Sequence, residues 1–443
     1  MKTLFKLFWI TLIVISIFSS CTKDEDPIFS ESPTERVNKT KSELSKLLLA
    51  EEQGYKGIYF SKNDEYGGAT FYFKFNDDGT VKSTSDFDSE TDLELTSYRV
   101  SLGTTATELV FEDRGHIQKM SNPSLQGLRG VGFKGTSVFQ YFGNENGALK
   151  FRDIRNKDTG FLTLFPTGFS DFKKESVESV KKSLAERKEF ITSAQVTAFP
   201  FLTAKTSNSD LSYDLNYDAL RFFAKPSKKE KDGSISEIIA GFLFTEEGLI
   251  VSPPIEVDGV SFEEFKKDTS NGLKYVSTVD GATAAIGYGM TPATPLDAYA
   301  FGVRRNIAFN NHYEPNKFSA SFNKFYKDFT GNLANNYNVI INWYGLIDLK
   351  GNLPYLLIVT NYGRIWFGIS FTVKDGIVKF SLTGSTNASA ETKAILQPFL
   401  DVILLAPQGY YLKKTGGLPD YSNRTFSMIN VADPTMWFNY FDY

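Results

Sequence analysis

The chain has 443 residues, a formal net charge of −4 at pH 7 and an aromatic content of 15%. This length predicts two or three domains of about 150 residues each, and the mildly negative charge argues against a nucleic-acid-binding protein, which needs a basic surface. The only cysteine is Cys21, so no disulfide can form within the chain and packing alone must stabilise the fold.

Residues 1–20 have the pattern of a secretory signal peptide. Lys2 and Lys6 flank the start of an apolar run over residues 7–18, which is shorter than the ~20 residues that a membrane-spanning helix needs. The end of the run, Phe-Ser-Ser before Cys21, resembles the lipobox of bacterial lipoproteins. That resemblance implies cleavage before Cys21 and lipid on its sulfur and amino group. The alternatives are an ordinary signal peptide with an incidental cysteine and an uncleaved signal-anchor helix.

A short charged segment follows Cys21. Its charged residues are Lys23, Asp24, Glu25 and Asp26. A lysine followed by acids at this place resembles the export signal of surface lipoproteins in the Bacteroidetes, which implies display on the outer face of the outer membrane. The alternative is a solvated tether without an address, since charge runs are commonly solvated.

The next part of the chain predicts a tether, a helix and a first β domain. Residues 21–32 form the acidic tether, and residues 33–54 form a helix with Ser32 as its N-cap, proline at its first position and glycine at its end. Residues 55–168 are a meander of short strands, because aromatic residues recur at every second position over 69–75. Such a meander is typical of a barrel or sandwich.

A connecting helix and a second β-rich region follow. Residues 169–207 hold the helix and a linker. Its apolar stripe comprises Val177, Val180, Leu184 and Phe190. Residues 208–443 again show strand patterns, and the Gly/Thr/Ala/Pro-rich stretch 279–296 predicts a long loop at which this region splits in two. Helices are expected near residues 318–329 and over 391–405, and the apolar C-terminal end is expected to be docked.

Strand, acidic residue, glycine and strand recur at Gly79, Gly248 and Gly376. The unequal intervals exclude a solenoid but fit two or three related β units. We therefore predict a mainly β protein, a β-rich α+β fold with two antiparallel barrel-like or sandwich-like domains and a few connecting helices.

The chain contains no catalytic motif of a metalloprotease or a serine hydrolase, and no nucleotide-binding loop. The two histidines, His116 and His312, are too few for a histidine-rich metal site, and each is expected to be a surface or hydrogen-bonded residue. No cofactor is expected. Alternating acids make one weak calcium candidate, whose alternative is an exposed acidic loop. These acids are Asp86, Asp88, Glu90 and Asp92.

Aromatic residues in two neighbouring strands are the best ligand candidates. Trp343 and Tyr344 are consecutive, so they lie on opposite faces of one strand, whereas Arg364 and Trp366 share a face of another. Indole rings stack on the C–H groups of sugars and guanidinium binds hydroxyls, which favours a glycan site that Tyr362 could extend. The alternative is that the tryptophan belongs to the core and the arginine reaches the rim.

Several segments together resemble the Bacteroidetes lipoproteins of domain-of-unknown-function family 4302. Besides the lipobox and the N-terminal helix, they are residues 67–81, 97–100, 109–123, 139–156 and 248–262. That family has no established activity. The resemblance implies a surface lipoprotein that is often encoded beside starch-utilisation-type outer-membrane transporters and their substrate-binding lipoproteins.

The expected function is therefore a non-enzymatic binding or accessory lipoprotein of a nutrient-uptake system. Its partners would be the outer membrane through the lipid anchor, a TonB-dependent transporter with its substrate-binding lipoprotein, and a glycan or peptide ligand. A hydrolase with unrecognised catalytic carboxylates and a structural or adhesive surface protein are the alternatives.

Overall fold

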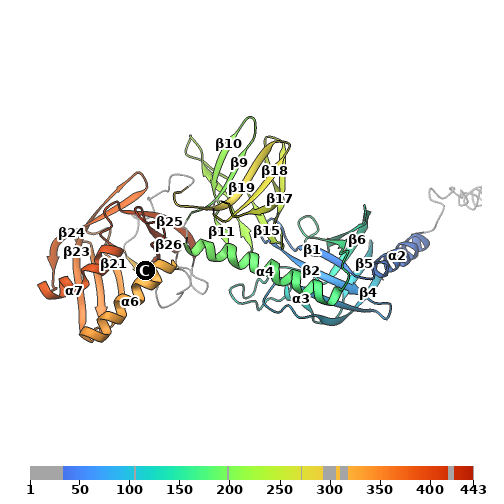
Figure 1. Cartoon of the computed structure of the whole chain (residues 1–443), viewed down its shortest axis with the longest axis horizontal. Helices are drawn as coiled ribbons and strands as arrows, with labels where there is room; N and C mark the ends of the chain where they lie inside the picture. The colour runs from blue at the N-terminus through green and yellow to red at the C-terminus, as the bar shows by residue number, and fades with distance from the viewer. Residues whose placement is uncertain are drawn as a thin grey trace, which may run out of the picture.

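The computed structural model describes residues 33–103, 106–196, 199–270, 272–292, 306–309, 318–417 and 424–442. The fold is mainly β, as expected from the sequence: of the residues described, 46% lie in strands and 20% in helices. Three β units lie in an elongated arrangement: a closed barrel, a curled sheet and a second closed barrel (Figure 1). We call them the first barrel, the middle sheet and the second barrel. The signal peptide, Cys21, the charged residues 23–26, Ser32 and His312 lie outside the described residues.

The first barrel has eight antiparallel strands and closes where β1 pairs with β8. Its strands are β1 (Tyr55–Phe60), β2 (Gly68–Phe75), β3 (Thr80–Ser85), β4 (Glu94–Leu102), β5 (Thr107–Phe111), β6 (Val138–Glu145), β7 (Ala148–Asp153) and β8 (Phe161–Pro166). Two helices accompany them: α2 (Pro33–Ala50), which packs on β4 and β5, and the short α3 (His116–Lys119).

The interior of the first barrel is aromatic. Phe71, Phe73 and Phe75 point inward, as the alternation predicted, and Leu44 and Leu48 of α2 join the same core. Tyr72 points outward but is only 3% exposed, because it packs near Phe172 at the start of the next helix. Burial on both faces of β2 explains why this strand is almost entirely apolar or aromatic.

The long helix α4 (Phe172–Val196) runs beside both the first barrel and the middle sheet (Figure 1). Its buried face differs from the expected valine and leucine stripe, since Val177 and Leu184 are only half-buried. Over residues 172–192, the buried positions are Phe172, Ser176, Ser179, Val180, Ser183, Arg187 and Phe190. Small serines allow close helix–strand approach, and two of these hydroxyls are satisfied by carbonyl oxygens of the preceding turn.

The middle sheet has eleven strands in the order β11-β12-β15-β16-β17-β18-β19-β9-β10-β13-β14. They are β9 (Phe199–Lys205), β10 (Asp210–Asp214), β11 (Tyr217–Asp218), β12 (Phe223–Ala224), β13 (Ser227–Lys229), β14 (Ile235–Glu237), β15 (Ala240–Phe244), β16 (Gly248–Val257), β17 (Val260–Asp268), β18 (Lys274–Val279) and β19 (Ala282–Gly289).

Strand β19 corrects the expectation of a loop over residues 279–296. Its small residues Ala282 and Ala284 and its Ile286 face the core of the sheet, while the strand pairs with β18 and β9. Phe190 of α4 fills the centre of that core and contacts five aromatic rings. Small residues therefore suffice on β19, because the large ring comes from the helix.

The first barrel and the middle sheet are joined by direct backbone contact. Gly67 donates a backbone hydrogen bond to the Arg221 carbonyl oxygen at 2.8 Å. A Cβ atom on Gly67 would lie only 2.1 Å from the Phe222 carbonyl oxygen and 2.3 Å from that of Phe242. The turn between β1 and β2 is therefore also a docking point, where only glycine leaves room for the neighbouring chain.

The second barrel closes where β20 pairs with β27. Its elements are β20 (Ile307–Phe309), α6 (Ala320–Tyr337), β21 (Ile341–Ile347), β22 (Tyr355–Thr360), β23 (Gly363–Lys374), β24 (Ile377–Thr386), α7 (Ala390–Ile403), β25 (Tyr410–Gly417), β26 (Arg424–Asn430) and β27 (Trp437–Asp442). The last two strands account for the expected docking of the C-terminal end.

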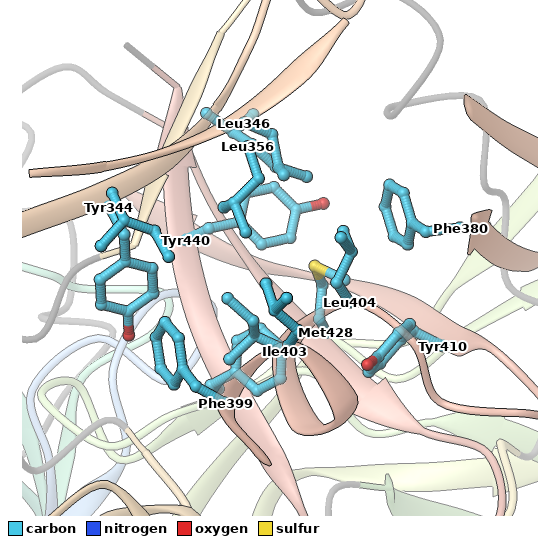
Figure 2. Packing of buried hydrophobic residues seen from close by; sticks show 14 of the residues in the cluster. Tyr344, Leu346, Leu356, Phe380, Phe399, Ile403, Leu404, Tyr410, Met428 and Tyr440 are labelled. Carbon is cyan, nitrogen blue, oxygen red and sulfur yellow. The ribbon is translucent and has the colours of Figure 1, made fainter. Parts of the chain in front are cut away.

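Helix α7 supplies part of the core of the second barrel. Phe399 and Ile403 lie among strand residues that include Tyr344, Leu356 and Met428 (Figure 2). Strands β24 and β25 pair only at residues 377 and 378, so the helix that connects them packs its apolar face into the barrel instead. Pro398 lies within this helix.

The three recurring glycine turns occur once in each β unit, but at different places. Gly79 joins β2 to β3 and Gly376 joins β23 to β24, both with positive φ, whereas Gly248 begins β16 without positive φ. The turns thus occupy non-equivalent hairpins, and they reflect local turn chemistry rather than equivalent positions in a repeated unit.

Candidate functional site

The structure separates the four predicted ligand residues into core and surface. Tyr344 is fully buried and packs against Phe399 with ring centroids 5.0 Å apart, so it belongs to the core. Trp343 and Trp366 are half-buried, and Arg364 is exposed. These three lie on the outer side of the second barrel, since their neighbours in each strand point into its core.

The strand register places these three side chains on one continuous surface. Trp343 is opposite Val359, which is opposite Arg364; one row further, Gly345 is opposite Leu357, which is opposite Trp366. The two tryptophans are therefore two strands and one row apart, or roughly 12 Å from strand spacing and rise. We call this surface, made by Trp343, Leu357, Val359, Arg364 and Trp366, the aromatic face.

Glycine determines how Trp343 lies. A Cβ atom on Gly345 would stand 2.7 Å from the Cη2 atom of Trp343, so the indole extends along its own strand over the glycine. Any other residue at 345 would have to displace the ring. The sequence Trp-Tyr-Gly therefore turns the tyrosine inward and provides a flat seat for the tryptophan outside.

A bulge in β24 borders the aromatic face. Between the pairs Phe367–Thr386 and Ile369–Leu382, β23 contributes one residue and β24 contributes three. The extra residues fold over Gly368, where a Cβ atom would meet the Thr383 hydroxyl oxygen at 2.5 Å. Hydroxyl groups thus adjoin the strand that carries Arg364 and Trp366.

Asn387 fixes the backbone beneath the aromatic face. Its side chain accepts a hydrogen bond from the Trp366 backbone N–H at 2.9 Å and donates one to the Arg364 carbonyl oxygen at 2.9 Å. The Thr386 hydroxyl also donates to the Trp366 carbonyl oxygen at 2.6 Å. These bonds replace ladder bonds that the bulge removes, so the two ligand candidates sit on rigid backbone.

Arg364 is a free cation within the described part of the chain, where its side chain forms neither an ion pair nor a hydrogen bond. Trp366 has a ring neighbour, Tyr355, with centroids 6.4 Å apart. The aromatic face therefore offers flat apolar surface beside one positive group, which suits stacking of sugar or peptide groups and hydrogen bonding to their oxygens.

Tyr362 lies at the turn between β22 and β23 and is 68% exposed. Its hydroxyl accepts a hydrogen bond from the Asn338 side chain at 3.1 Å. It stands at the end of the aromatic face rather than within the rows of paired residues.

The four alternating acids are not brought together as a ligand shell. Asp86 is 2% exposed and accepts a hydrogen bond from the Thr70 backbone N–H. Burial raises its pKa to about 6, although the nearby charge of Arg187 opposes this rise. Asp88 and Glu90 instead bind the Lys119 ammonium at 3.2 and 2.7 Å. No group of three or more potential ligands could hold a metal in the residues that the structure describes.

One polar cluster was missed in the sequence. Ser85 and His116 are far apart in sequence, yet the serine Oγ lies 3.2 Å from the histidine Nδ1. The other ring nitrogen lies 2.8 Å from the Asp92 carbonyl oxygen and 3.7 Å from Glu94. Serine and histidine at this distance could suggest a nucleophile and a base, but both are buried, so no substrate reaches them. His116 is a hydrogen-bonded core residue.

A further titratable contact lies between the middle sheet and the second barrel. Phe199 and Tyr411 contact each other edge to face at 5.5 Å, and Lys413 lies over the Phe199 ring. Burial lowers the pKa of Lys413 to about 8, although Asp214 opposes this shift. The contact fixes the second barrel at one point of the middle sheet and presents no carboxylate pair for hydrolysis.

Among the helices that can be described, none is both long and apolar enough to span a membrane. A family model with the description Domain of unknown function (DUF4302) matches residues 25–269. This match includes the first barrel, α4 and the middle sheet as far as β17, and it excludes the aromatic face. No curated protein matches the chain.

Proposed function

The chain belongs to the DUF4302 family, and from this premise we propose that it is a surface-anchored, non-enzymatic binding or accessory lipoprotein. It would capture a glycan or peptide for an outer-membrane nutrient-uptake system. In this proposal Cys21 carries the lipid and residues 23–26 direct the protein outward. A TonB-dependent transporter and its substrate-binding lipoprotein would be the partners in a Bacteroidetes outer membrane.

The aromatic face is the observation that carries the binding part of this proposal. Two tryptophans and an arginine, separated by 23 positions of sequence at most, share one outer surface of three neighbouring strands. The half-buried indoles on this outer surface leave ring area available for stacking with a ligand. A glycan is the favoured ligand, since sugar rings present C–H faces to indole and hydroxyls to Arg364.

Binding is tested by affinity electrophoresis and calorimetry against a panel of soluble glycans and peptides. We expect at least one ligand, with Trp343→Ala and Trp366→Ala each weakening its affinity about tenfold or more, as for an aromatic stacking contact. Val373→Ala is the matched control, because Val373 is an exposed apolar residue of β23. If a ligand binds equally well to both tryptophan variants and to the wild type, this site is excluded. If no glycan and no peptide binds, the binding role is excluded.

The anchor is tested separately. Metabolic labelling with a fatty acid should mark the wild-type chain and leave Cys21→Ala unlabelled, with the variant released from the membrane fraction. Protease added to intact cells should degrade the wild type at the surface, and neutralising residues 23–26 should protect it. If the wild type carries the fatty acid but resists the added protease, the lipid anchor is supported and the outward address is rejected.

A further inference from the structure

We propose that the part of the outer face of β6, β7, β8 and β1 that the middle sheet leaves uncovered docks on an anionic lipid membrane. The face consists of two exposed phenylalanines and three basic residues. They are Phe142, Phe165, Lys56, Lys150 and Arg152. We call this set the basic–aromatic face; it is distinct from the aromatic face of the second barrel.

Phe142 lies at a bulge in β6. Tyr141 is opposite Phe151 and Gly143 is opposite Lys150, so Phe142 is the extra residue between two consecutive rungs of the ladder. Gly143 has a φ of +130°, a conformation that other residues rarely adopt. Phe142 follows Tyr141, which packs against the barrel core, so Phe142 points outward and is 57% exposed.

The basic residues lie against the two rings. The Arg152 guanidinium is 4.4 Å from the centroid of Phe142, and the Lys150 ammonium is 5.9 Å from that of Phe165. Phe165 is 41% exposed and is directly opposite Lys56 in the pairing of β8 with β1. Cation and ring therefore alternate across four adjacent strands.

The positive charge of this face is only partly compensated, since Lys56 interacts with the buried Asp86 and Lys150 with Glu263. Within the described parts of the chain, the three basic side chains form no ion pair. Glu263 of β17 is the acid that interacts with Lys150: burial and Glu264 raise the pKa of Glu263, and the lysine opposes that rise. Exposed rings beside lysine and arginine match the interface of an anionic membrane, where aromatic groups enter the headgroup region and cations contact phosphates.

The position of this face agrees with the proposed lipid anchor, on which the inference rests in part. Eleven residues lie between Cys21 and Pro33, where α2 begins, so the start of α2 stays within about 40 Å of an anchored Cys21. Helix α2 packs on the first barrel, whereas the second barrel lies at the other end of the molecule (Figure 1). Docking through the first barrel would leave the aromatic face far from the lipid.

The test uses the chain from residue 21 onward with Cys21→Ser, so that binding cannot come from a lipid chain. Sedimentation with phosphatidylcholine vesicles is compared with sedimentation on vesicles that also contain phosphatidylglycerol. We expect binding only to the anionic vesicles, weakened by salt. Each of Lys150→Gln and Arg152→Gln should cost about fivefold in affinity, and Phe142→Ser with Phe165→Ser should cost at least tenfold.

Leu353→Ser and Lys379→Gln are the controls, since both residues are exposed on the second barrel, and they should bind as the parent does. A second measurement does not depend on whether the serine variants fold. With Cys21 replaced, Phe142→Cys carries the only thiol, and an environment-sensitive dye there should shift to the blue on anionic vesicles, whereas a dye on Leu353→Cys should not.

Several outcomes would overturn the inference: equal binding to neutral vesicles, no binding to either, or equal loss in the controls. Binding to soluble dextran sulfate that does not need the phenylalanines would instead indicate a polyanion site. None of these outcomes bears on Cys21 lipidation or on ligand affinity at Trp343 and Trp366, which are measured separately.

Discussion

Replacement of Arg187 by methionine should uncouple the first barrel from helix α4. Arg187 is 8% exposed and its Nη2 donates hydrogen bonds to the carbonyl oxygens of Asp86 at 2.6 Å and Phe87 at 3.0 Å. The same guanidinium lies 4.2 Å from the ring centroid of Phe222. One side chain thus links the barrel, the helix and the turn between β11 and β12 of the middle sheet.

The expected cost follows from these contacts. A hydrogen bond from a charged donor contributes about 1.5–3 kcal/mol, and its loss leaves a buried carbonyl oxygen without that donor. A buried cation–π contact adds about 2 kcal/mol, while the smaller desolvation cost of methionine offsets part of the loss. We expect Arg187→Met to lower the free energy of unfolding by about 3–5 kcal/mol.

The loss should also depend on pH, because the charge of Arg187 holds down the pKa of Asp86. Without Arg187 that pKa rises further above about 6. At pH 5 the carboxyl is mostly neutral in both proteins, whereas at pH 8 only the wild type has a cation beside the carboxylate. Arg187→Met should therefore cost more at pH 8 than at pH 5.

Urea unfolding at the two pH values measures both effects. Arg99→Met is the matched control, because Arg99 belongs to β4 of the first barrel but forms an exposed ion pair with Glu112, worth about 0–1 kcal/mol. If Arg187→Met costs no more than Arg99→Met, or costs the same at both pH values, the assignment of Arg187 as the link is refuted.

Three further changes test the buried acid Asp86, the contact of Gly67 with the middle sheet, and the support that Asn387 gives to the aromatic face. Burial raises the pKa of Asp86 from 3.8 to about 6, so its neutral form favours folding, and the wild type should lose about 3 kcal/mol as pH rises from about 4 to 6. Asp86→Asn should not show this loss; equal pH profiles in urea unfolding would contradict the shift. Gly67→Ala places a Cβ atom against two carbonyl oxygens and should cost about 3 kcal/mol or more, whereas Gly331→Ala, in open space on α6, should be neutral or slightly stabilising; matching melting temperatures would refute the docking role of Gly67. Asn387→Ala should cost about 1–2 kcal/mol in stability and weaken ligand affinity several-fold without touching Trp366 itself, and unchanged affinity would show that the bonds do not position the site.

Local patterns predicted much of the fold. Alternation over residues 69–75 gave the inward Phe71, Phe73 and Phe75, and consecutive Trp343 and Tyr344 gave one outer and one inner ring, as the structure has them. Such patterns report which residues share a face of one strand. They do not report what covers the other face, so burial of Tyr72 under the start of α4 could not be read from β2 alone.

The misses have a common physical cause, which is that the partner lies far away in sequence. Residues 282–289 looked too poor in large side chains to form a core strand, but Phe190 fills the space from almost a hundred positions earlier. The carbonyl oxygen of Phe242 requires glycine at position 67, but Phe242 lies 175 positions later in the chain and nothing near Gly67 indicates this contact. The role of Asn387 depends on a bulge in β24, and no periodicity marks that bulge.

The family match ends inside the middle sheet rather than at its last strand, and this boundary separates the two proposed binding surfaces. The match ends at residue 269, just after β17, yet β18 and β19 complete the path from β17 to β9 and bury Tyr275 and Ile286 around Phe190. The middle sheet therefore needs residues beyond the matched region. The basic–aromatic face lies inside that region and the aromatic face lies outside it. A shared scaffold that rests on the membrane, extended by a barrel that selects the ligand, would account for a family defined by the scaffold alone.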